Sequence, residues 1–218
     1  MNDLIETPDD LYAQFSQGKR EAGGYLSQIS FLVVDDNEFA RKITRDVLKA
    51  LGARRVKYAE DGAEALEILE RIEMDIVVLD WNMPIMDGIE LTRSIRNSDD
   101  RPNKFMPIIM MTGYSELSNV MYARDAGVTE YLIKPFSAKQ FLSRIRSIAE
   151  NPRSFVRTET FFGPDRRRHR KKTFKGEEKR GEALPAEKKE PEKNDIHKKA
   201  IPQKDVDNYF GGANADED

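Results

Sequence analysis

The sequence predicts a doubly wound α/β domain built on a five-stranded parallel sheet. Five short apolar runs, rich in Val, Ile and aromatic residues, recur between about residues 28 and 150, and segments of helical periodicity lie between them. Continuous apolar runs of this length are typical of parallel strands buried on both faces. Alternating strands and helices imply right-handed crossovers that place helices on both sides of the sheet.

The expected strands are, in chain order, ISFLVV (29–34), RVKYA (55–59), DIVVL (75–79), PIIMM (107–111) and EYLI (130–133). The first expected helix has an apolar stripe that ends before Gly52, a residue suited to a helix C-terminus. That stripe consists of Phe39, Ile43, Val47, Leu48 and Leu51. Four later helices are expected around Leu66, Leu69 and Ile72; around Ile89, Thr92 and Ile95; around Leu117, Val120 and Met121; and around Phe141, Leu142, Ile145 and Ile148.

Composition divides the 218 residues into three parts. Residues 1–27 form a polar arm in which a short helix is expected, and residues 28–150 form the α/β domain. Residues 151–218 mix both charges with Pro and Gly and have few apolar residues, so we expect a largely disordered tail. The first 150 residues carry 19 Lys+Arg against 25 Asp+Glu, and the tail carries 17 against 14. An acidic domain therefore precedes a basic tail.

Several classes of protein are disfavoured by what the chain lacks. It has no cysteine, which rules out disulfides and thiolate metal sites. No run approaches the roughly 20 apolar residues of a membrane helix, and the acidic N-terminus does not resemble a secretory signal. A cytoplasmic protein without membrane insertion is the expectation.

Carboxylates follow two of the expected strands directly. Asp35 and Asp36 come after the first strand and Asp80 after the third. Parallel strands end at one edge of a sheet, so these acids would converge if the two strands are neighbours. Oxygen ligands without His or Cys favour a hard cation such as Mg²⁺, and a carboxylate can attack phosphorus to form an aspartyl phosphate. Thr112 and Lys134, at the ends of the fourth and fifth strands, supply a hydroxyl and an ammonium group.

These positions, together with DWNMPIMDG (80–88) and Pro135 after Lys134, resemble the CheY-like receiver domain of two-component response regulators. The resemblance covers about residues 28–150. It implies a flavodoxin-like sheet with strand order 2-1-3-4-5. Because no known output domain fits in the polar tail, a stand-alone receiver is expected.

The resemblance also implies a role for each matching residue. Asp80 would accept a phosphoryl group from a histidine kinase or a histidine phosphotransfer protein. Thr112 and Lys134 would contact that phosphoryl group, and the Lys134–Pro135 peptide would be cis. Mg²⁺ would be bound by Asp35, Asp36, Asp80 and the backbone carbonyl of Asn82.

Tyr131 resembles the aromatic switch of the family, although a static strand residue is the alternative. Its rotation inward would follow movement of Thr112. The face made by the fourth helix, fifth strand and fifth helix would then change and bind an unidentified downstream target.

An enzyme is the alternative to this switch. Phosphatases that resemble haloacid dehalogenases also use a strand-end aspartate with Mg²⁺, but they carry a second acid two residues later, where this chain has Asn82. No nucleotide-binding glycine loop or Ser-His-Asp set is present. The sequence therefore favours a phosphorylation switch over an enzyme.

Three interpretations of the basic segment at 153–175 stay open. It carries nine Lys+Arg against two acids, with four phenylalanines interleaved. It could be a solvated linker, a docking peptide, or a site for an anionic ligand such as a cyclic dinucleotide or nucleic acid. The candidate anion-binding residues are Arg166, Arg167, Arg168 and Arg170. The terminal DVDNYFGGANADED is expected to be a solubilising end, with a partner-recognition motif as the alternative.

Overall fold

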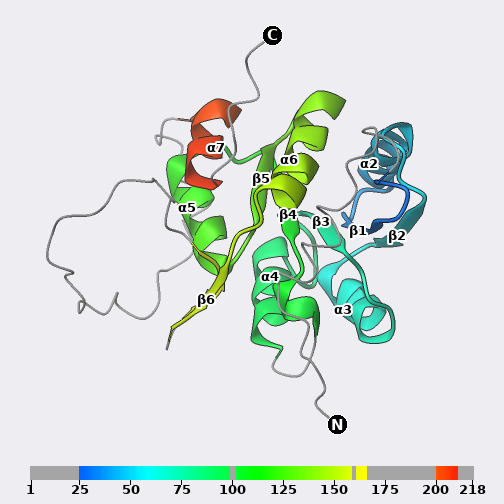
Figure 1. Ribbon diagram of the computed structural model, residues 1–218, viewed down its shortest axis with the longest axis horizontal. Helices are drawn as coiled ribbons and strands as arrows, with labels where there is room; N and C mark the ends of the chain where they lie inside the picture. The colour runs from blue at the N-terminus through cyan, green and yellow to red at the C-terminus, as the bar shows by residue number, and fades with distance from the viewer. Residues whose placement is uncertain (1–24, 99–101, 159–160, 166–199, 211–218) are drawn as a thin grey trace, which may run out of the picture.

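A computed structural model describes residues 25–98, 102–158, 161–165 and 200–210 (Figure 1). The first part of the chain forms β1 (Ser30–Val34), α2 (Glu38–Ala50), β2 (Arg55–Ala59), α3 (Gly62–Arg71), β3 (Ile76–Asp80), α4 (Gly88–Asn97) and the 3₁₀ turn η1 (Pro102–Phe105). The second part forms β4 (Ile108–Thr112), α5 (Leu117–Ala126), β5 (Glu130–Ile133), α6 (Ala138–Glu150), β6 (Phe155–Arg157), β7 (Phe162–Pro164) and α7 (Gln203–Phe210).

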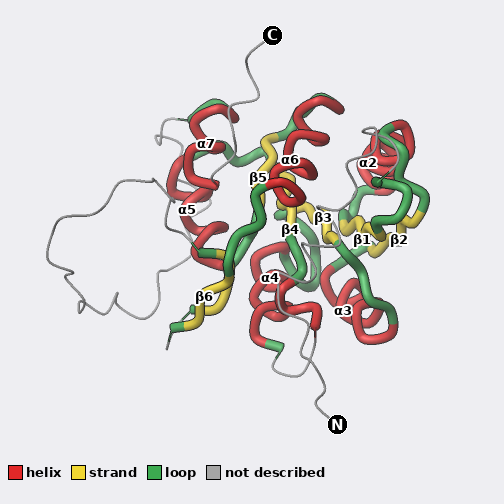
Figure 2. Tube along the Cα trace, in the orientation of Figure 1, coloured by secondary structure: helices red, strands yellow, loops and turns green. Residues whose placement is uncertain are grey.

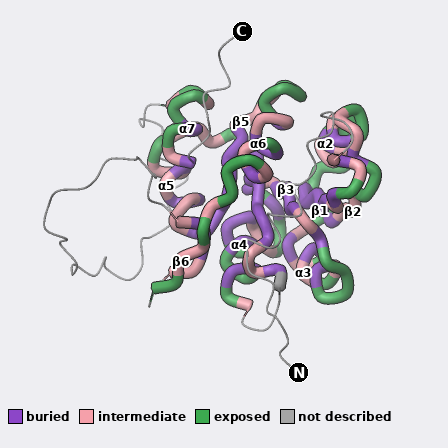
Figure 3. The backbone as a smooth tube through the Cα atoms, in the orientation of Figure 1, coloured by how far each residue is buried: buried purple, intermediate pink, exposed green. Residues whose placement is uncertain are grey.

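The five long strands form one parallel sheet in the order β2-β1-β3-β4-β5. The apolar runs thus became strands within one residue of the expected ends, and the 2-1-3-4-5 order is confirmed. Alternate strand residues enter two separate cores. Leu32, Val77 and Met110 face the helices α3, α4 and α5, whereas Val33, Val78 and Ile109 face α2 and α6. The tube in Figure 2 shows the strands enclosed by helices, and Figure 3 shows the central strands to be the most buried part of the chain.

Local sequence signals explain where the helices begin. The side chains of Asn37, Asp61, Asp87 and Ser137 each accept a hydrogen bond from a backbone N–H in the first turn of the next helix. Such caps satisfy donors that have no partner within the helix. Asp87 and Ser137 form complete capping boxes with Glu90 and Gln140. The helices after β1, β3 and β5 therefore start close to the sheet edge where those strands end.

The prediction that Phe39 and Ile43 line a buried face was wrong. Phe39 is 71% exposed and Ile43 46% exposed, whereas Leu48, farther along α2, is fully buried. The 13 residues of α2 span about 20 Å, but the five residues of β1 span only about 16 Å. The first turns of α2 therefore extend beyond the sheet. Leu117, expected on the stripe of α5, is also largely exposed.

Part of the predicted tail is folded onto the domain. The antiparallel pair β6 and β7 packs Phe155 and Phe162 edge-on against Phe105, at ring-centroid distances of 5.3 Å each. The helix α7 lies beside α5 and β5 (Figure 1). None of these three elements was predicted from the sequence. The predicted arm helix and residues 166–199 and 211–218 of the predicted tail lie outside the described residues.

Within the described ranges, no helix is both long and apolar enough to cross a lipid bilayer.

Candidate functional site

Three of the predicted site residues meet where β1, β3 and β5 end. The Lys134 ammonium lies 2.5 Å from Oδ1 of Asp80 and 3.0 Å from Oδ2 of Asp35. The sheet order explains the meeting, because β1 and β3 are hydrogen-bonded neighbours and Lys134 follows β5 directly. One cation therefore bridges two carboxylates, which would otherwise repel each other.

The two bridged carboxylates differ in how far water can reach them. The Asp35 side chain is almost fully buried, and its Oδ1 accepts a hydrogen bond of 3.0 Å from the backbone N–H of Asn37. The Asp80 side chain retains 13% exposure, and its Oδ2 accepts a 2.7 Å bond from the backbone N–H of Asn82. Asp80 is thus held in a fixed orientation and can still be reached from outside.

The pKa values of Asp80 and Lys134 are both raised, but for different reasons. Desolvation raises the pKa of Asp80, although the hydrogen bond and the charge of Lys134 oppose that change. Desolvation alone would lower the pKa of Lys134, but the hydrogen bond that Lys134 donates to Asp80 and the charges of Asp80 and Asp35 outweigh it, so this pKa is raised. Lys134 therefore stays a cation next to Asp80, the more accessible of the two carboxylates.

Thr112 lies at the end of β4 and is almost fully buried. Its backbone carbonyl accepts a 2.7 Å bond from the Lys134 N–H, and its hydroxyl oxygen accepts a 3.0 Å bond from the Tyr114 N–H. The register places it one residue beyond Met111, which pairs with Asp80. Thr112 is therefore next to the site, but none of the hydrogen bonds found within the described ranges joins its hydroxyl to the two carboxylates.

Asp36 and Asn82 lie at the exposed rim. Asp36 makes no hydrogen bond or ion pair with the rest of the described chain. The side-chain amide of Asn82 donates a 3.0 Å bond to the hydroxyl of Tyr114. Within the described ranges no three Asp, Glu, His or Cys side chains are gathered into a ready-made metal site. The donor chemistry nevertheless fits Mg²⁺, because a buried acid, a half-buried acid and an exposed acid adjoin a backbone carbonyl and all are oxygen ligands.

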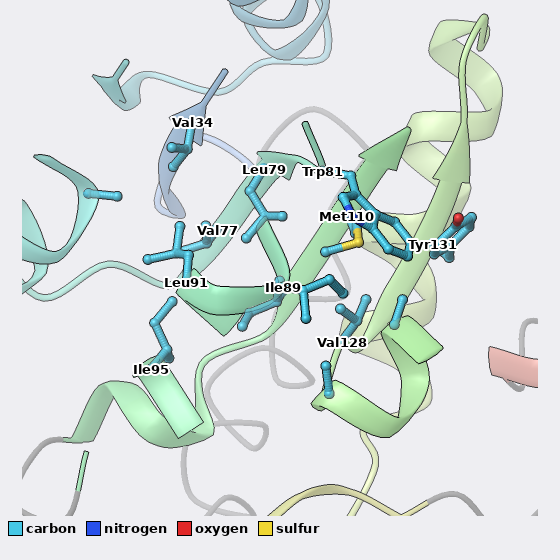
Figure 4. Packing of buried hydrophobic residues seen from close by; sticks show 14 of the residues in the cluster. Val34, Val77, Leu79, Trp81, Ile89, Leu91, Ile95, Met110, Val128 and Tyr131 are labelled. Carbon is cyan, nitrogen blue, oxygen red and sulfur yellow. The ribbon is translucent and has the colours of Figure 1, made fainter. Parts of the chain in front are cut away.

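Tyr131 links this edge to the neighbouring face of the domain. It is completely buried, and its hydroxyl donates a 2.7 Å bond to the backbone carbonyl of Tyr114. Trp81 lies edge-on to its ring at 6.4 Å, and Figure 4 shows the two side chains facing each other across the core. Burial raises the pKa of the Tyr131 hydroxyl, so it stays a hydrogen-bond donor.

Tyr114 was not predicted from the sequence as a site residue. This residue contacts the backbone or side chain of three site residues: Thr112, Tyr131 and Asn82. Its position two residues after a strand-end threonine was the only available signal. The Lys134–Pro135 peptide is cis, as expected. The candidate anion-binding residues Arg166, Arg167, Arg168 and Arg170 lie outside the described residues.

A doubly wound sheet with an accessible aspartate, a buried aspartate and a lysine at its carboxyl edge defines a class of phosphoryl-accepting signalling domains. The model of the response regulator receiver domain matches residues 31–146 of this chain. The chain therefore belongs to the response regulator receiver family. Members of this family act in two-component phosphorelay signalling, and they typically bind Mg²⁺ in the active site.

Curated relatives and solved structures agree with this assignment. Chemotaxis protein CheY-3 of Vibrio cholerae is 36% identical over 122 residues, which are 56% of this chain and 92% of that protein. Chemotaxis protein CheY of Pseudomonas aeruginosa is 38% identical over 122 residues, covering 56% and 97%. The structure of CheY4 of Vibrio cholerae is similar with a TM-score of 0.51 and 30% identity, covering 55% of this chain and 98% of that one. The matches leave the C-terminal segment outside the shared domain.

Proposed function

We propose that this protein is a receiver that accepts a phosphoryl group on Asp80 and thereby switches its protein contacts. The observation that supports this most strongly is the contrast between the three acids. Asp35 touches Lys134 but is buried, and Asp36 is exposed but touches no cation. Asp80 alone among the three combines access from outside with a 2.5 Å contact to Lys134. A nucleophile for phosphorus needs both properties.

In the proposed reaction an Asp80 carboxylate oxygen attacks the phosphorus of a phosphohistidine. The new O–P bond forms as the P–N bond breaks, and the imidazole nitrogen of the donor keeps the electron pair and takes up a proton. The Lys134 ammonium and the Thr112 hydroxyl offset charge on the phosphoryl oxygens. Mg²⁺ held by Asp35, Asp36, Asp80 and the Asn82 carbonyl would supply the remaining positive charge.

The surface around Asp80 supports a protein as the phosphoryl donor. Phe39 and Ile43 on α2 and Ile85 in the loop after β3 are large apolar side chains, and they are 71%, 46% and 84% exposed. They belong to the chain segments that follow Asp36 and Asp80 directly. Exposed large apolar side chains in the segments that follow the site acids are typical of a docking surface, which suits a histidine kinase or a histidine phosphotransfer protein.

Labelling with a small phosphodonor tests the acceptor directly. The full chain is incubated with acetyl phosphate and Mg²⁺ and examined by intact-mass spectrometry. We expect one alkali-labile phosphoryl adduct on the wild type and none on Asp80→Asn. Asp46→Asn, which changes an exposed aspartate on α2, should be labelled like the wild type. Equal labelling of Asp80→Asn and wild type would reject Asp80 as the acceptor.

The alternative function, an anionic-ligand site in the basic segment 153–175, stays a prediction. The structure describes only the beginning of that segment, where Phe155 and Phe162 are packed against Phe105. These two rings therefore serve the fold and are not presented as platforms for stacking on bases.

A further inference from the structure

The face formed by α5, β5 and α6 is covered by a segment from the far end of the chain. Residues 200–210 begin there with a bridge between Ala200 and Glu116, and the Ile201 N–H donates a 2.9 Å bond to the Ser115 carbonyl. The helix α7 follows and contacts both α5 and β5. Residues 151–199 separate this segment from α6, the last element of the face in the sequence, so the contact is a tertiary one.

The first turn of α7 satisfies the open edge of the sheet. β5 is the last strand in the sheet order, so the backbone groups on its outer side have no strand partner. The Gln203 side chain accepts a 2.7 Å bond from the Ile133 N–H, and its amide donates a 2.8 Å bond to the Tyr131 carbonyl. One glutamine thus mimics the peptide group of a neighbouring strand.

The apolar side of α7 covers the switch aromatic. Val206 and Phe210, four residues apart and hence on one helix face, are 0% and 1% exposed. The Phe210 ring stacks on Tyr131 at 5.8 Å with an interplanar angle of 20°. Tyr131 is therefore enclosed between Trp81 on one side and Phe210 on the other.

An ion pair fixes the register of the helix. Asp207 accepts a 2.7 Å bond from the Arg144 guanidinium, which also lies 3.4 Å from Glu130. All three side chains are nearly buried. Glu130 gains a second bond of 2.8 Å from the Ser147 hydroxyl. The Arg144 guanidinium has several hydrogen-bond donors, and Glu130 alone does not satisfy them. Asp207 of α7 supplies the second carboxylate.

The receiver is complete without this helix. The family model ends at residue 146, and the curated CheY relatives are spanned almost entirely by the 122 matched residues. An eight-residue helix is too short to persist alone in water, so α7 depends on the face for its order. A complete domain with a dependent helix on it has the arrangement of a receptor and a ligand.

We propose that α7, a short acidic amphipathic helix of this same chain, is a detachable ligand of the α5–β5–α6 face. The chemistry of the ligand follows from the contacts. It needs an aliphatic and an aromatic side chain four residues apart, an acid beside the aliphatic one to pair with Arg144, and a glutamine one turn earlier for β5. A partner that uses this face must displace α7.

Peptide binding to the full chain tests this proposal. A fluorescein-labelled peptide of residues 200–210 is titrated against wild type, Phe210→Ala and Lys204→Ala, with anisotropy as the readout. Phe210→Ala removes the buried ring of the resident helix, so we expect this chain to bind the peptide at least about tenfold more tightly than wild type. Lys204 is exposed on α7, so Lys204→Ala should behave like wild type.

Variant peptides separate specific docking from general stickiness. Peptides with Asp207→Ala or Val206→Ala should bind the Phe210→Ala chain much more weakly than the parent peptide, and the Lys204→Ala peptide should bind as the parent does. Equal binding to wild-type and Phe210→Ala chains, or no binding to either, would overturn the proposal. A Phe210→Ala chain that loses its folded circular dichroism spectrum would overturn it too, because α7 would then be part of the core.

Discussion

Two clusters of buried charge lie at the two ends of β5, and each contains two acids and one base. At the carboxyl end Lys134 joins Asp35 and Asp80. At the amino end Arg144 joins Glu130 and Asp207. Both clusters have the same types of charged group, but they differ in how far water can reach them. The Lys134 side chain is 31% exposed, whereas that of Arg144 is 3% exposed.

The difference in exposure separates a cluster that an outside molecule can reach from one that only holds the fold together. Lysine is a compact charge on a flexible stem, and it can follow an incoming phosphoryl group. Arginine offers several donors in a rigid plane, and here both acids on it are enclosed by the fold. The Asp80 cluster is thus open to chemistry, and the Arg144 cluster joins α6, β5 and α7.

The largest expected effect on stability comes from removing Arg144, and removing Lys134 is the comparison. Arg144→Met leaves Glu130 and Asp207 buried without a cation, so we expect the free energy of unfolding to fall by about 3–5 kcal/mol. Lys134→Met should cost less, because water reaches Lys134 and Asp80, although the buried Asp35 loses its cation. Urea unfolding measures both. Phosphodonor labelling should be lost in Lys134→Met, and similar stability losses in the two variants would contradict the distinction.

Glu130, one of the acids paired with Arg144, should make the free energy of unfolding depend on pH. Burial raises the pKa of Glu130 from 4.5 to about 7, against the opposing effects of Arg144, Ser147 and Arg153. Between these values the folded state holds a proton that the unfolded state has released, so stability falls as pH rises from 4.5 to about 7. We expect a loss on the order of 2 kcal/mol, measured by urea unfolding at pH 5 and pH 8. Glu130→Gln should flatten this dependence, and an unchanged slope would refute it.

The geometry of the cluster of Lys134, Asp35 and Asp80 should depend on the close packing of Gly88 against the backbone of Asp80 and Trp81. A Cβ at Gly88 would overlap the Asp80 carbonyl oxygen and lie 3.1 Å from the Trp81 Cα, whereas a Cβ at Gly113 would meet nothing within 4 Å. Gly88→Ala should therefore destabilise the chain by about 1–3 kcal/mol and slow phosphodonor labelling. Gly113→Ala should change stability by less than about 0.5 kcal/mol. Equal thermal denaturation midpoints for the two variants would be the contrary result.

The smallest expected effect tests whether the Asp80 site is coupled to α7. The hydrogen bonds and ring contact that link Thr112, Tyr114, Tyr131 and Phe210 in turn join the Asp80 edge to α7. If Asp80 is the acceptor, beryllium fluoride with Mg²⁺ should favour the inward Tyr131 on which Phe210 stacks. Amide exchange at residues 203–210 should then slow by about fivefold. Asp80→Asn should show no slowing, and an unaltered rate in wild type would exclude the coupling.

Much of the fold and the Asp80 site could be predicted because the signals are local. Most strands are short apolar runs, and each site residue stands at the end of such a run or just after it, so topology alone brings Asp35, Asp80 and Lys134 together. The exposure of Phe39 was not predictable from periodicity, since helical spacing says which residues share a face and not whether the sheet reaches that far.

The docking of α7 could not be predicted for a different reason. Val206, Tyr209 and Phe210 are few apolar residues in a charged segment, and their order depends on a distant face that complements them. Arg144 likewise resembles an ordinary charged residue on α6 until Asp207 is placed beside it. Such long-range pairings leave no periodic trace in the sequence.

The covalent connection between α7 and the receiver sets a threshold for outside molecules. A tethered ligand acts at an effective concentration that is set by the length and stiffness of the connecting chain and not by its intrinsic affinity. Weak or scarce competitors would be ignored, and only an abundant or tight one could take the face. The protein would thereby bind only those partners whose affinity and concentration are high enough to displace α7.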